Sequence, residues 1–201
     1  IIYLIHFASK KATLRFTKFK FRRGLILREF ISGIPSGITE MSPGIVTFIF
    51  NRFIVAFMHE RELIIYSILS YVILLATVLA NGIAQGAQPL VSYYHGRHER
   101  GAFHTIFRYE IKSGILLAAV EAVLIVAFGK YIAMLFVGEG DGLSTDIVYA
   151  LRLVAVAFPL LSMNVIIAGY LTALERSRVA VVISLMRCTL TLIVALAIIV
   201  A

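Results

Sequence analysis

Several polar side chains interrupt apolar stretches of the chain, at positions where they could bind a solute. Asn81, Gln85 and Gln88 follow one another at intervals of four and three residues, so a helix would place all three amides on one face. Inside a bilayer such groups need other helices or water as hydrogen-bond partners. The spacing supports interhelical hydrogen bonds and the lining of a cavity equally. For Asn164, in a later apolar stretch, we expect packing between helices, with cavity lining as the alternative.

Three of the charged residues within the apolar stretches are candidates for a functional or structural role. Glu40 is about ten residues inside such a stretch, which corresponds to about 15 Å along a helix. Carboxylates at membrane depth are costly and often serve as proton or cation sites, so Glu40 is the candidate for cation coupling. The alternative is that Glu40 reaches water or pairs with a basic residue. For Glu121 and Arg187, two further buried-charge candidates, a structural ion pair between Arg187 and an acid is favoured over a substrate site.

The remaining reactive residue types support no enzyme. His95, His98 and His104 lie in a basic segment beside arginines, which disfavours cation binding, and Cys188 is the single cysteine. No phosphate-binding glycine loop, nucleophile elbow or zinc-protease motif is present. The sequence therefore predicts no metal site and no cofactor, and it gives no support for catalysis.

The composition indicates what kind of secondary structure contains these candidate residues. Of the 201 residues 60% are hydrophobic, and the mean hydropathy is +0.94, far above the range of soluble domains. The net charge of +8 is concentrated between the apolar stretches and forms no basic face interleaved with aromatic residues. We therefore expect a multi-pass α-helical protein whose partner is a lipid bilayer, and no binding of nucleic acid.

The apolar stretches divide the chain into segments. Residues 1–8 are too short to cross a bilayer and are expected to be the end of a truncated helix, and residues 9–29 form a basic connector. Residues 30–201 are expected to form a five-span transmembrane lobe, with spans at about 30–58, 63–94, 107–137, 147–171 and 179–201. Because the chain starts and stops within apolar runs, we expect it to be part of a longer protein.

Charge asymmetry predicts the orientation of these spans. The connector 9–29 and the turns at 95–101 and 175–178 carry most of the arginine and lysine between spans, so they are expected to be cytoplasmic. The acidic segment 138–146 and the short turn 59–62 are expected outside. The predicted location is the plasma membrane.

Glycine and proline mark two special places. The segment 33–44 contains two prolines and three glycines, which predicts a bent or locally unwound helix. Gly82 and Gly86 are four residues apart, a spacing that lets a neighbouring helix approach closely.

The run at 82–96, GIAQGAQPLVSYYHG, resembles the eighth helix of MATE (multidrug and toxic compound extrusion) transporters and the turn after it. The GIPSG run at 33–37 is similar to the seventh helix of that family. Pro159 and the AGYLTA run at 168–173 are similar to its tenth helix, and the basic connector is similar to the link between its two lobes.

The resemblance implies twelve helices in two six-helix lobes, joined in a transporter that works by alternating access. Such proteins export drugs, organic cations and other small amphiphilic compounds in exchange for Na⁺ or H⁺. The chain would then contain the end of helix 6 and helices 7 to 11, most of the C-terminal lobe, with a missing N-terminal lobe as its partner. Glu40 falls in the seventh-like helix, a few residues nearer the proline than the usual glutamate, and the tenth-like span has no carboxylate. The resemblance therefore places cation coupling at Glu40 or in the missing lobe.

Two other functions remain open at the level of sequence. A lipid-linked oligosaccharide flippase of the same wider superfamily would need basic side chains in the cavity, and Arg187 and Arg152 are the residues to check. A structural membrane subunit without a substrate would have buried polar residues that pair with one another.

Overall fold

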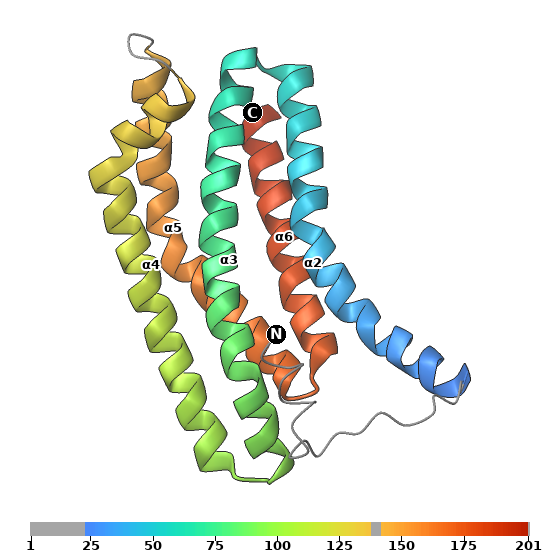
Figure 1. Cartoon of the computed structure of the whole chain (residues 1–201). Coiled ribbons are helices and arrows are strands. Elements are labelled where there is room, and N and C mark those ends of the chain that lie inside the picture. Colours follow the sequence, from blue (N-terminus) through green and yellow to red (C-terminus); the bar gives the residue numbers. More distant parts are fainter. Residues whose placement is uncertain (1–22, 138–141, 201) are drawn as a thin grey trace, which may run out of the picture. The chain divides into compact units, whose positions relative to one another are not determined.

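The computed structural model describes residues 23–137 and 142–200. These residues form five α-helices joined by short turns (Figure 1). The predicted all-α membrane fold is confirmed. The helices are α2 (Arg23–Phe57), α3 (Glu60–Gly96), α4 (Arg100–Phe136), α5 (Leu143–Ala173) and α6 (Ser177–Val200). The predictions for residues 1–8, for most of the connector 9–29 and for part of the acidic segment 138–146 lie outside the described residues.

The chain divides into two units, residues 1–34 and residues 35–201, and the second unit holds everything described below. Within it, α5 packs against α3, α4 and α6, and α3 also packs against α4 (Figure 1). The chain therefore builds this unit around α5, which borders more of the described helices than any other.

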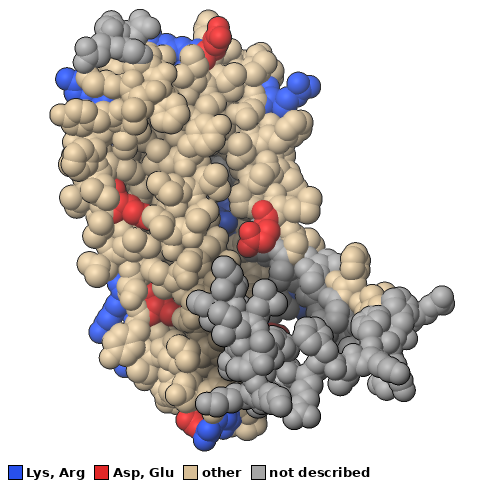
Figure 2. Space-filling model, in the orientation of Figure 1, with Lys and Arg blue, Asp and Glu red and all other residues tan. Residues whose placement is uncertain are grey.

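Four of the described helices are long and apolar enough to cross a membrane. They are α3, α4, α5 and the 18-residue segment Glu40–Phe57 of α2. A bilayer core needs about 20 residues of helix. In the view of Figure 2, lysine, arginine and acidic side chains gather near the helix ends, and few interrupt the surface between them. The chain is an integral membrane protein.

Many large apolar side chains of the second unit are exposed, whereas several alanines are buried between its helices. Ala76, Ala118 and Ala133 are at most 3% exposed, whereas Leu135 is 83% and Val156 is 78% exposed. Lipid tails are as apolar as leucine, so large apolar side chains gain nothing by turning inward, and small residues let backbones approach. The described surface is therefore built to contact lipid.

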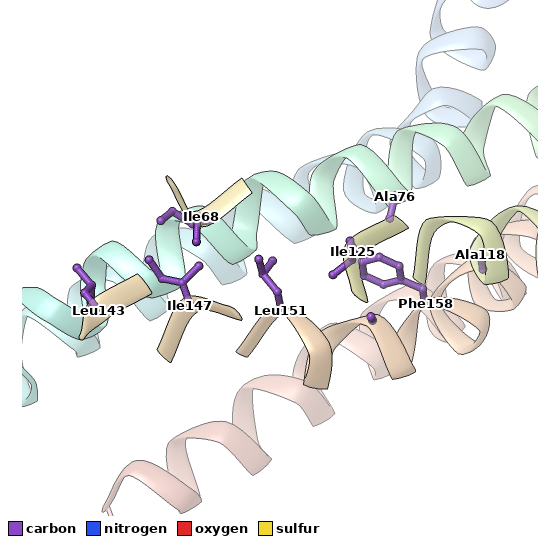
Figure 3. Close-up of a cluster of buried hydrophobic side chains, with 10 residues drawn as sticks. Ile68, Ala76, Ala118, Ile125, Leu143, Ile147, Leu151 and Phe158 are labelled. Carbon is purple, nitrogen blue, oxygen red and sulfur yellow. The ribbon is translucent and has the colours of Figure 1, made fainter. Parts of the chain in front are cut away.

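A cluster of buried apolar side chains joins α3, α4 and α5. Leu143, Ile147, Leu151 and Phe158 lie along one face of α5 at helical spacing, and the ring of Phe158 lies next to Ile125 of α4 (Figure 3). Ile68 and Ala76 of α3 complete the contact. This cluster holds the half of α5 that precedes Pro159 against both neighbours.

The closest helix contacts are at two glycines that the sequence did not single out. A Cβ atom at Gly169 of α5 would lie 2.8 Å from the Cβ of Ala84, and one at Gly114 of α4 would lie 2.2 Å from Ile166 Cδ1. The close approach predicted at Gly82 and Gly86 is wrong for the described part of the chain, where no atom of a neighbouring helix lies within 4 Å of a Cβ atom placed on either glycine. Spacing alone does not say which face of a helix meets a neighbour.

Helix α2 is continuous from Arg23 to Phe57. The local unwinding considered for residues 33–44 is therefore not observed, although this segment contains Pro35 and Pro43. Pro89 and Pro159 likewise lie inside α3 and α5 without ending either helix.

The helices α3 and α5 end in the same way. His98 and Glu175, which follow their C-caps, both have φ 60°, in the left-handed region. The next amide bonds back to the fifth carbonyl before it, Glu99 N–H to Tyr94 O at 3.1 Å and Arg176 N–H to Leu171 O at 2.9 Å. This is the Schellman pattern, which reverses the chain sharply after a helix.

Candidate functional site

A cavity of about 410 Å³ lies within the second unit, bounded by α2, α3, α5 and α6. Its volume is in the range of small-molecule sites. More than half of its lining residues are polar or charged, which is unusual for a surface inside a membrane protein. The polar and charged lining residues are Glu40, Thr77, Asn81, Gln85, Gln88, Asn164, Thr172, Ser184 and Arg187.

Helix α3 supplies the longest polar wall. Thr77, Asn81, Gln85 and Gln88 succeed one another at intervals of four, four and three residues, which places them on one face, and all four line the cavity. Thr77 Oγ1 donates to Ile73 O at 2.7 Å, so its hydroxyl is satisfied within its own helix. The three amides make no side-chain hydrogen bond to any described residue. Their donors and acceptors are thus free to face the cavity.

Helix α5 forms a second wall, next to α3. Asn164 lines the cavity and also makes no side-chain hydrogen bond within the described residues. Ala168, Gly169 and Thr172 continue this wall one and two turns later. Because Gly169 has no side chain, Ala84 of α3 can pack directly onto α5 at the cavity's edge. The polar faces of α3 and α5 thus meet at a direct contact between two small residues.

Two charged groups face the cavity, one of each sign. Glu40 comes from α2 and Arg187 from α6, and among the described residues no other side chain of the lining is charged. The Glu40 side chain is exposed and that of Arg187 is half-buried. An acid and a base on the wall of one cavity can bind opposite charges of a solute, while the amides hydrogen-bond its neutral polar groups.

The structure thus brings together six of the residues that the sequence singled out and leaves one apart. Asn81, Gln85, Gln88, Asn164, Glu40 and Arg187 line one cavity. Glu121 lies on α4, half-buried, with its Oε1 unpartnered among the described residues, and it does not line this cavity. The ion pairs between described residues that the structure shows, Arg61–Asp146 and Arg97–Glu99, are at helix ends.

The sequence did not single out every residue of this site. Thr77, Thr172 and Ser184 line the cavity, and each lies three to eight residues from a residue on its own helix that the sequence singled out. Helical spacing from Asn81, Asn164 and Arg187 is the signal that could have found them. No group of three or more His, Cys, Asp or Glu side chains in the described part of the chain is arranged to hold a metal ion.

Glu110 is not among the residues that the sequence singled out. The structure buries it within α4, away from the cavity, with its Oε2 lacking any hydrogen-bond partner in the described residues. Its neighbours come from α5, about 60 residues later in the chain, so no local pattern around residue 110 marks it.

Comparison with known protein families gives one match. The family model described as MatE matches residues 35–197, which include every residue that lines the cavity. No curated protein matches the chain, and no solved structure matches it.

Proposed function

The chain belongs to the MatE family of transporters, which are not enzymes, and we propose that it exports drugs or other small cationic and amphiphilic compounds in exchange for Na⁺ or H⁺. The cavity between α2, α3, α5 and α6 is the proposed substrate site. This proposal rests mainly on the lining of the cavity. The lining combines amides that have no hydrogen-bond partner among the described residues with one acidic and one basic side chain.

The amides distinguish this proposal from a structural role. Amides that serve as glue between helices hydrogen-bond across the interface. Asn81, Gln85, Gln88 and Asn164 make no such bond within the described residues, although they share one cavity. Unpaired amides on a polar wall support binding of a solute or its water.

The charges of the cavity weigh against a flippase of lipid-linked oligosaccharides. Such a substrate carries phosphate, which calls for several basic groups in the site. Arg187 is the single basic residue that the described part of the chain contributes to the lining, and Arg152 is exposed on α5 away from the cavity. One arginine opposite one carboxylate fits a small compound with few charges better.

We further propose that a second helical lobe closes this cavity, with the membrane as the plasma membrane and the turns after α3 and α5 inside the cell. The cavity walls at Glu40 and Gln85 are exposed, which supports an open side toward such a partner. Rocking between two lobes would then expose the site to either side of the membrane in turn.

Within this mechanism Glu40 exchanges the coupling cation with the substrate. A carboxylate binds either a cation or a cationic group of the substrate, and competition for one group is sufficient to couple the two flows. Arg187 and the amides would orient the substrate during this exchange.

The experiment is drug susceptibility and efflux in cells that express the full-length protein with Glu40→Gln. We expect resistance and cation-driven efflux to fall to nearly the level of cells without the protein, because the amide keeps the shape and loses the charge. Glu60→Gln is the matched control, since Glu60 is exposed at the start of α3 and outside the cavity. Unchanged resistance in Glu40→Gln would remove Glu40 from the mechanism.

A further inference from the structure

Glu110 is an acidic side chain buried in the interior of the second unit. It is 4% exposed, and its Oε2 has no hydrogen-bond partner among the described residues. It also takes part in none of the ion pairs that the described residues form. Acidic side chains are almost never buried to this degree without a partner, so the site needs a physical explanation.

Contacts on either side of Glu110 fix where it lies. One turn before it, the ring of Phe107 lies 4.2 Å from the ring of Tyr170 on α5. One turn after it, the backbone oxygen of Gly114 accepts a hydrogen bond of 3.1 Å from Ser162 Oγ, also on α5. Because both flanking turns of α4 contact α5, Glu110 faces the stretch of α5 between Ser162 and Tyr170.

Tyr170 is a polar residue in the stretch of α5 that Glu110 faces. Its side chain is 8% exposed, its hydroxyl has no hydrogen-bond partner among the described residues, and its ring packs against Phe107, one turn before Glu110. Two buried oxygen-bearing groups without a described partner thus come from two helices that pack together. A hydroxyl is a neutral neighbour, and it cannot compensate a negative charge as a cation would.

The other titratable groups around this interface are placed differently. On α4 itself, Arg108 and Lys112 are exposed. From α3, Tyr94 is half-buried in the aromatic cluster beside Tyr170, and His95 packs edge-on against Phe103, about two turns of α4 away from Glu110. No cationic side chain of the described residues forms an ion pair with the carboxyl.

An ionised carboxylate in such a place is costly. Burial of a charge without a partner costs several kcal/mol, whereas a neutral carboxylic acid costs far less. We propose that Glu110 is a proton-binding site between α4 and α5, separate from the cavity, in which the carboxyl holds its proton at neutral pH beside the Tyr170 hydroxyl.

The location of this site links it to the cavity. Helix α5 turns Tyr170 toward Phe107 of α4, one turn from Glu110, and turns Asn164, Ala168 and Thr172 toward the cavity. Loss of the proton leaves a carboxylate that requires water, and water reaches it when α4 and α5 separate. The movement of α5 then displaces a cavity wall. This coupling step rests on the proposed transport function, whereas binding of the proton does not.

Infrared spectroscopy tests the site directly. The full-length protein is reconstituted in lipid vesicles, and the C=O stretching band of protonated carboxylic acids is recorded at neutral pH for the wild type and for Glu110→Gln. We expect a band in the wild type that the variant lacks. Glu175→Gln, which removes an exposed acid from the turn after α5, is the matched control and should leave this band intact.

Two more variants keep the test decisive. Glu110→Asp retains an acid and should retain a protonated band, which separates loss of the group from loss of the fold. Tyr170→Phe should retain the band and shift its frequency, because the hydroxyl lies next to the acid. Identical wild-type and Glu110→Gln spectra in the acid region would overturn the proposal. Since no substrate is used, a failure of the transport function leaves this result unaffected.

Discussion

Gly169 shows how much the packing of this protein depends on single atoms. A methyl group at this position would lie 2.8 Å from the Cβ of Ala84, and an alanine Cβ has no rotamer by which to move aside. The helices α3 and α5 would have to separate, in a bilayer where packing is a main source of association. Gly86 is the useful contrast, because nothing lies within 4 Å of a Cβ placed there.

We expect Gly169→Ala to destabilise the protein by about 1–3 kcal/mol through overpacking, even though alanine favours the helix by about 1 kcal/mol. Thermal unfolding in detergent, followed by circular dichroism, measures the change. Gly86→Ala should leave the stability unchanged or raise it. The double variant Gly169→Ala with Ala84→Gly should recover most of the loss, since it moves the methyl group from one helix to the other. A double variant as unstable as the single one would contradict this account.

At the scale of the helix, α5 has different surfaces for different neighbours. Its first half packs large apolar side chains such as Phe158 and Leu151 against α3 and α4. After Pro159, the face toward α4 carries Ser162 and Tyr170, and another face carries the cavity residues. The helix ends at Leu174, followed by Glu175 with a positive φ. A side chain in this left-handed region costs free energy that glycine does not.

Replacement of Glu175 by glycine should therefore stabilise the turn after α5 by about 1 kcal/mol. Glu175→Ala is the matched control, because it also removes the charge but retains the Cβ atom that causes the strain. We expect a higher melting temperature for the glycine variant alone. Equal gains for glycine and alanine would show that the charge, and not the backbone conformation, is responsible.

The sequence was sufficient for the fold class and for part of the site. Long apolar stretches predict membrane helices because a bilayer requires them, and the spacing of Asn81, Gln85 and Gln88 places them on one face. The sequence was not sufficient for contacts between helices. Whether Gly82 or Gly169 contacts a neighbouring helix depends on residues far away in the chain. The local sequence around each glycine does not distinguish the two cases. The burial of Glu110 likewise depends on α5, whose Tyr170 and Ser162 contact the flanking turns of α4.

At the scale of the whole molecule, the distribution of charged residues among the turns follows the alternating direction of the helices. The turns after α3 and after α5 are basic, with Arg97 and Arg100 in one and Arg176 and Arg178 in the other. The turn between α2 and α3 and the N-terminus of α5 are joined by the Arg61–Asp146 ion pair, with 2.6 Å between Nη2 and Oδ2. Helices that alternate in direction place these two pairs of turns on opposite sides of the membrane.

We predict that the two basic turns are cytoplasmic, and cysteine labelling in intact cells tests this orientation. In a Cys188→Ser background, a membrane-impermeant maleimide should label Glu60→Cys and leave Arg100→Cys and Arg176→Cys unlabelled. Permeabilisation of the membrane should make both of the latter reactive. All three positions are exposed, so access to the solvent does not limit the reaction. Labelling of Arg176→Cys in intact cells would reverse the assigned orientation.

The covering of one face of α4 by α5 has a consequence for biogenesis. The ribosome completes α4 before it begins α5, so Glu110 reaches the translocon before Tyr170 and Ser162 have been made. An acidic residue within a membrane helix raises the free energy of insertion, and the apolar remainder of α4 must offset this cost. We expect α4 to remain beside the translocon until α5 emerges, and the two helices to enter the lipid together as a hairpin. The order of synthesis then favours pairing of α4 with α5, the same two helices that pack around Glu110 in the folded protein.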